Sequence, residues 1–178
     1  MRRIRIAIAV AAAAIAVAAT PAEAQRARAG SYVTYAAAPN AARDSMAFAR
    51  AQQLSMRADK RWHAYDLAGA RRDFQAAVEI LRARQLYAGP TLVSLANVTY
   101  TVDEPAKAAR VLVDAAEEAA AFGDIVVQAQ SLFEASVLYK EAGDMGQALR
   151  LLDATRKVLK SQYLPQDVKS AIERRIIE

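Results

Sequence analysis

The amino-acid sequence predicts an all-α protein in which antiparallel helix pairs stack as an α-solenoid. Apolar side chains recur at intervals of three and four residues from about residue 45 onward, and no segment alternates apolar and polar residues as a strand would. Small residues let a neighbouring helix approach closely while a large residue fills the gap, so a repeat of about 40 residues is typical of stacked helix pairs. One such small–large–small pattern occurs three times, with starting residues 38 and then 40 positions apart: Ala70-x-x-x-Phe74-x-x-Ala77, Ala108-x-x-x-Leu112-x-x-Ala115 and Ala148-x-x-x-Leu152-x-x-Thr155.

The first 24 residues have the three regions of a secretory signal peptide, which we expect to be cleaved between Ala24 and Gln25. Three arginines lie within the first five residues, residues 6–19 carry no charge, and Ala22-Glu23-Ala24 forms an A-x-A cleavage site. The uncharged run is 14 residues long, shorter than the ~20 that span a bilayer. We therefore expect a periplasmic or secreted protein with no stable membrane insertion after cleavage. An uncleaved anchor and an Ala-rich helix of the mature fold are the alternatives.

Cleavage would leave 154 residues (178 − 24), enough for one domain with its own core. The sequence has no cysteine, so an exported domain of this kind depends on packing rather than on disulfides. Its net charge would be +3, from 21 basic and 18 acidic residues. Residues 43–84 carry nine Lys and Arg against five Asp and Glu, whereas residues 103–124 carry two against six. We interpret these segments as solvated helix faces, and self-association through complementary patches is the alternative. No dense basic stripe with interleaved aromatic residues occurs, which argues against a nucleic-acid partner.

Local signals place the helices in a domain predicted over residues 43–178, after a flexible lead-in at residues 25–42. The first helix begins near Ser45, and its predicted buried stripe is Phe48, Ala51, Ser55, Ala58, Trp62 and Tyr65. The later helices are expected to start at an acidic N-cap or an early proline, namely Asp66, Pro90, Asp103-Glu104-Pro105, Asp124, Asp144 and Pro165. Gly123 and Gly143 are expected to end the helices before them.

The helix pairs resemble the tetratricopeptide repeat family, and the third pair matches it best. The resemblance covers about residues 45–161 as three repeats, and the helix from Pro165 resembles a C-terminal capping helix. The repeats are longer than the family's usual length of about 34 residues. Arg57 and Arg61 also stand where apolar residues belong in the first helix. A generic helical bundle is the alternative fold. The matching positions of the third pair are Leu132, Ser136, Tyr139, Ala148, Leu152 and Thr155.

Neither catalysis nor metal binding is expected from these residues. His63 is the only histidine, cysteine is absent, and no nucleophile elbow or Gly-rich phosphate loop occurs. Glu117-Glu118 is interpreted as a solvated helix face rather than as a cation site. We therefore expect a non-enzymatic protein that uses no cofactor or metal.

The resemblance implies a concave groove, lined by the first helix of each pair, in which a peptide or helix of a partner protein binds. The expected function is a protein–protein interaction module of the bacterial cell envelope. A binder of a small molecule or of a peptidoglycan fragment is the alternative. A core position is likewise the alternative for Trp62 and Phe133. The predicted groove residues are Ser55, Asp59, Trp62, Val93, Asn97, Tyr100, Phe133, Val137 and Lys140.

Overall fold

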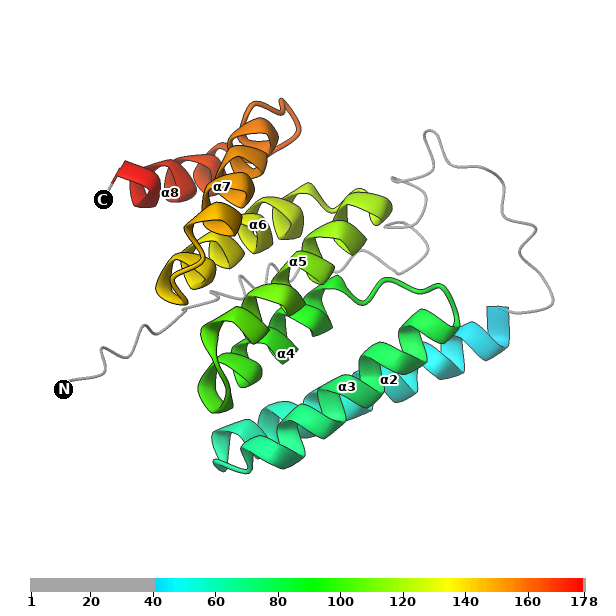
Figure 1. The fold of residues 1–178 in the computed structure, drawn as a ribbon. Helices are drawn as coiled ribbons and strands as arrows, with labels where there is room; N and C mark the ends of the chain where they lie inside the picture. Colours follow the sequence, from blue (N-terminus) through cyan, green and yellow to red (C-terminus); the bar gives the residue numbers. More distant parts are fainter. Residues whose placement is uncertain (1–40, 178) are drawn as a thin grey trace. The chain divides into compact units, whose positions relative to one another are not determined.

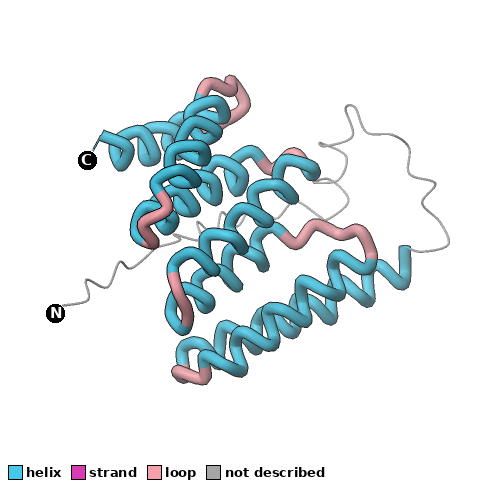
Figure 2. The backbone as a smooth tube through the Cα atoms, in the orientation of Figure 1, coloured by secondary structure: helices cyan, strands magenta, loops and turns pink. Residues whose placement is uncertain are grey.

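The computed structural model describes residues 41–177, so the predicted signal peptide and residues 25–40 of the predicted lead-in lie outside the described residues. Within the described range the chain forms helices joined by turns and contains no strand, as predicted (Figure 2). The first helix begins at Ala41, so residues 41 and 42 belong to this helix rather than to the lead-in. The helices are α2 (Ala41–His63), α3 (Leu67–Ala83), α4 (Gly89–Val102), α5 (Pro105–Phe122), α6 (Ile125–Glu141), α7 (Met145–Leu159) and α8 (Gln166–Ile177).

Local capping fixes most of the helix ends where the sequence predicts them. The side chains of Asp66, Asp124 and Asp144 each accept a hydrogen bond from the backbone N–H three residues on, at 2.9–3.1 Å. These bonds satisfy N–H groups that have no partner inside α3, α6 and α7. Gly123 and Gly143 follow α5 and α6 with φ of 75° and 84°, a left-handed conformation that glycine adopts without steric cost.

The start of α5 differs from the prediction, because Asp103 does not cap it. Glu104 is the N-cap residue, and its side chain makes no capping hydrogen bond. The Asp103 carboxylate instead accepts hydrogen bonds from Arg71 Nη1 at 3.0 Å and from Lys107 Nζ at 2.5 Å. Two cations therefore outcompete the backbone for this carboxylate, and Pro105 at the first turn removes one N–H group that would need a cap.

Neighbouring helices pack as antiparallel pairs, α2 with α3, α4 with α5 and α6 with α7 (Figure 1). In the view of Figure 1, α3, α5 and α7 lie in front of α2, α4 and α6. Contacts also join α4 to α6 and α6 to α8, each time skipping one helix. Two side-chain interactions make these longer links. Tyr100 of α4 bonds Glu141 of α6, and Arg175 of α8 bonds Glu134 of α6, both across 41 residues of sequence.

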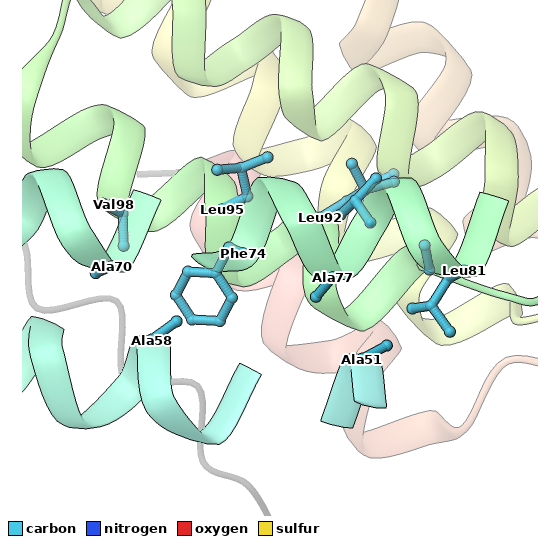
Figure 3. Close-up of a cluster of buried hydrophobic side chains, with 12 residues drawn as sticks. Ala51, Ala58, Ala70, Phe74, Ala77, Leu81, Leu92, Leu95 and Val98 are labelled. Carbon is cyan, nitrogen blue, oxygen red and sulfur yellow. The ribbon is translucent and has the colours of Figure 1, made fainter. Parts of the chain in front are cut away.

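The small–large–small residues lie in the core, most completely in the first pair. Phe74 is 1% exposed and lies among Ala58, Ala70 and Ala77, each of which is fully buried (Figure 3). In the second pair Leu112 is 4% exposed. Leu152 of the third pair is only partly buried. Burial of the central residue therefore weakens toward α7, for which the described residues provide no helix beyond it in the α3–α5–α7 series.

The arginines that depart from the repeat pattern hold α2 to α3. Arg57 donates from Nε and Nη2 to the two oxygens of Asp73, each at 2.7 Å, and Arg61 Nη1 lies 3.0 Å from the same carboxylate. Asp73 itself is 5% exposed. The hydrogen bond from Arg57 is the main cause that holds the Asp73 pKa below its usual value, and burial opposes it. A polar pair thus replaces the apolar contact expected at these positions.

Two residues of the predicted buried stripe of α2 are exposed instead. Phe48 is 55% exposed and Tyr65 is 83% exposed, whereas Ala51 and Ala58 are buried. Tyr65 lies two residues after the end of α2 and has a φ of 61°, so helical periodicity no longer sets its direction. Phe48 is three residues before Ala51 and thus lies at the edge of the face that Ala51 and Ala58 define. The face of α2 that packs against α3 is therefore narrower than the apolar stripe that the sequence predicts.

Candidate functional site

One row of residues on each of α2, α4 and α6 is exposed or partly exposed, and the three rows share the same spacing of four, three and four residues. The rows are 38 and then 40 residues apart, which is the spacing of the small–large–small pattern. Equivalent residues of successive helix pairs thus retain solvent exposure, fully at eight positions and partly at Ser94, Asn97, Glu134 and Val137, and we call these twelve residues the exposed strip. They are Gln52, Met56, Asp59 and His63 of α2, Pro90, Ser94, Asn97 and Thr101 of α4, and Gln130, Glu134, Val137 and Glu141 of α6.

The nine predicted groove residues include one residue of each row. Asp59, Asn97 and Val137 belong to the exposed strip. Each of the other six lies one residue before a strip position, which turns its side chain about 100° round the helix. The six are Ser55, Trp62, Val93, Tyr100, Phe133 and Lys140.

Four of these six side chains pack against the core. Trp62 contacts the cluster around Phe74, and Val93 and Tyr100 contact the cluster formed by α4, α5, α6 and α7. Phe133 is 3% exposed in the cluster that includes α8, with the Arg175 guanidinium 4.6 Å from its ring centroid. Phe133 is therefore a core residue and not a groove residue, because α8 covers this side of α6. Ser55 is partly buried and Lys140 is exposed.

Tyr100 joins the α4 and α6 rows. Its hydroxyl lies 3.1 and 3.2 Å from the two carboxylate oxygens of Glu141, to which it donates. Burial is the main cause that raises the pKa of Tyr100, and the hydrogen bond and negative charge of Glu141 add to it. The bond sets the carboxyl ends of α4 and α6 side by side, so the last residues of their rows are neighbours.

Asp59 lies at the centre of the α2 row. Loss of surrounding water raises the pKa of its carboxyl, and the charge of nearby His63 partly opposes this shift. The Asp59 side chain is itself exposed. The His63 ring in turn stacks against Trp62, with ring centroids 6.3 Å apart.

The exposed strip offers hydrogen-bonding groups and few apolar ones. Within the described residues no hydrogen bond engages the side-chain amides of Gln52, Asn97 or Gln130. The hydroxyls of Ser94 and Thr101 donate to carbonyl oxygens of their own helix, at 3.3 and 3.0 Å, and keep their acceptor capacity. Such a face suits a ligand that carries many polar groups, such as a peptide backbone.

The described residues contain no group of three or more His, Asp or Glu side chains that would hold a metal ion. Over residues 41–177 no helix combines the length and the apolar character that crossing a membrane requires.

A separate hollow lies on α3 beside the end of α4. Its volume is about 380 Å³. Its lining residues are Ala68, Arg71, Arg72, Gln75 and Val102, none of which belongs to the exposed strip. Sequence reasoning did not single out these residues. The sequence does contain a signal for this hollow. Arg71 precedes Gln75 by four residues, a spacing that places the guanidinium and the amide on one helix face.

No protein-family model, curated protein or solved structure matches this chain. Its function therefore has to follow from the geometry of the described residues.

Proposed function

We propose that this chain is an exported, non-enzymatic interaction module of tetratricopeptide-like architecture, in which the exposed strip binds a segment of a partner protein. Stacking of the pairs as a solenoid, export through residues 1–24 and a location in the periplasm or outside the cell are parts of this proposal. The signal-peptide pattern of the sequence supports the export.

The observation that carries the proposal is the register of the exposed strip. Asp59, Asn97 and Val137 are equivalent residues of successive pairs; Asp59 is exposed, Asn97 is partly exposed, and Val137 is partly buried against the cluster that includes α8. The offsets of 38 and 40 residues between the rows equal those of the small–large–small pattern, as expected when equivalent helices of stacked pairs expose the same face. The Tyr100–Glu141 bond supports the same arrangement, because it links the first helices of successive pairs.

The polar character of the strip supports a peptide as the ligand. The free amide of Asn97 lies at the centre of the α4 row, where an extended segment crossing the three helices would offer it backbone N–H and C=O groups. Trp62 and Tyr100 flank the rows and are partly exposed. Aromatic side chains at such positions commonly supply much of the binding energy.

Site-specific photo-crosslinking tests this proposal in the cell that produces the protein. A photoreactive phenylalanine replaces Asn97 or Gln130 of the strip in the full chain, and matched controls carry it at the exposed α5 positions Asp114 or Glu117. We expect a defined adduct with another protein from the strip positions only. Equal yields from α5, or no adduct from either strip position, would refute a binding role for the strip. An adduct of the chain with itself would refute an adaptor and indicate self-assembly.

A further inference from the structure

Two arginines and no carboxylate line the hollow on α3. Arg71 and Arg72 both line it, together with the amide of Gln75. Its volume of about 380 Å³ lies in the range of small-molecule sites, roughly 300–1,000 Å³. The hollow shares no residue with the exposed strip, so a ligand here is independent of the proposed peptide function.

Arg71 is held in place from outside the hollow. Its Nη1 lies 3.0 Å from Asp103 Oδ2, and Lys107 Nζ lies 2.5 Å from the other oxygen of the same carboxylate. The hydrogen bond from Lys107 is the main cause that lowers the pKa of Asp103, with Arg71 contributing. One carboxylate thus faces two cations and orients the Arg71 side chain at the wall of the hollow.

Arg72 has no ion-pair partner among residues 41–177. The carboxylate of Asp73 is paired with Arg57 and Arg61, and the charge of Arg72 acts on it only at longer range, as one of the smaller causes that lower the Asp73 pKa. Glu104 follows Asp103 in the chain but does not line the hollow. The guanidinium of Arg72 therefore keeps its charge and its hydrogen-bond donors for a ligand.

The remaining wall is apolar. Val102, the last residue of α4, is 43% exposed, and Ala68 lines the hollow beside it. Arginine side chains bind carboxylate and phosphate oxygens through paired N–H groups, which gives direction as well as charge. We propose that this hollow binds a small organic anion, whose carboxylate or phosphate oxygens contact Arg71, Arg72 and Gln75 and whose apolar part rests on Val102.

Titration of the full chain with phenyl phosphate and with benzoate tests the proposal, followed by NMR of the Val102 methyl groups and the Gln75 side-chain amide. Both probes combine an oxyanion with an apolar ring. Inorganic phosphate lacks the ring, and benzylammonium keeps the ring but reverses the charge. We expect saturable shifts at Val102 and Gln75 with both ring anions. Inorganic phosphate should bind several-fold more weakly, and benzylammonium should not bind.

Arg72→Gln should weaken binding of the ring anions at least about tenfold, the cost of a lost charge-assisted hydrogen bond. The matched control is Arg50→Gln, an exposed arginine of α2 that does not line the hollow. Equal weakening by both variants would overturn the proposal, because net charge alone would then explain binding. Absence of saturation at Val102 and Gln75, or equal binding of benzylammonium, would overturn it too. Inorganic phosphate binding as tightly as phenyl phosphate would refute the role of the apolar wall.

Discussion

Truncation of Phe74 should remove more stability than the equivalent truncation in either later pair. The Phe74 ring is 1% exposed and lies among the fully buried alanines Ala58, Ala70 and Ala77 (Figure 3). Alanine side chains cannot move into the space that the ring leaves, so Phe74→Ala should leave a cavity. Loss of about 100 Å² of buried apolar area costs about 2.5 kcal/mol at ~25 cal/mol per Å². The unfilled cavity adds about 2 kcal/mol, which places the change near 4.5 kcal/mol.

The same reasoning predicts a decrease along the chain. Leu112→Ala should cost about 3 kcal/mol, since Leu112 is 4% exposed in the second pair. Leu152→Ala should cost only about 1 kcal/mol, because Leu152 is partly exposed on α7. Leu149→Ala is the control for α7. Leu149 is 57% exposed, so the change should stay within about 0.5 kcal/mol.

Urea unfolding followed by far-UV circular dichroism measures these costs, provided that the slopes of free energy against urea are the same for all variants. Trp62, the only tryptophan, packs against the Phe74 cluster and gives a second signal by fluorescence. Equal costs for Phe74→Ala and Leu152→Ala would refute the reasoning, because Leu152 would then be as well covered as Phe74. A cost below about 2 kcal/mol for Phe74→Ala would show that the cavity collapses.

Three further changes test local interactions. Asp73→Asn should lower the free energy of unfolding at neutral pH and make it less dependent on acid, as measured by a pH titration of the dichroism signal. The reason is that the lowered pKa of Asp73 gives a stabilisation that is complete above the unfolded-state pKa of about 3.9 and is lost as the pH falls through the folded-state pKa. Gly143→Ala should cost about 1 kcal/mol in a thermal melt, because its φ of 84° is strained for alanine while no atom lies within 4 Å of the added carbon. Tyr100→Phe should cost under about 1 kcal/mol and remove one tyrosine that titrates above the usual range near 10, since burial and Glu141 raise the Tyr100 pKa.

Helix ends were predictable wherever the determining interaction is local. Asp66 and Asp144 cap the N–H groups three residues ahead, and Gly143 takes the left-handed conformation that a glycine at this point indicates. Asp103 has the same local signal but engages Arg71, which lies 32 residues earlier in the chain. A sequence pattern holds no information about that competitor until the helices are packed, so the cap of α5 could not be predicted.

Only one residue of each row in the exposed strip was among the predicted groove residues. The spacing of apolar residues shows which residues of a helix share a face, and on this basis Asp59, Asn97 and Val137 were predicted at positions that belong to the exposed strip. It does not give the direction of the neighbouring helices. Phe133 shares the predicted face with Val137, and both pack against the cluster that includes α8, Phe133 with only 3% exposure and Val137 partly buried. A prediction that is shifted by one residue along a helix turns the expected open face by about 100° and therefore selects core residues in place of groove residues.

Arg57 and Arg61 show how a departure from a repeat pattern carries structural information. Two arginines one turn apart on α2 and an aspartate within the small–large–small row of α3 are each unfavourable at a helix interface when considered alone. Together they form one ion-pair network around Asp73, which is 5% exposed. Sliding α2 along α3 by one turn in either direction would separate Asp73 from one of its two arginines. The network thus favours a single register of the first pair, and that register sets the positions of Gln52, Asp59 and the rest of the α2 row relative to the hollow on α3.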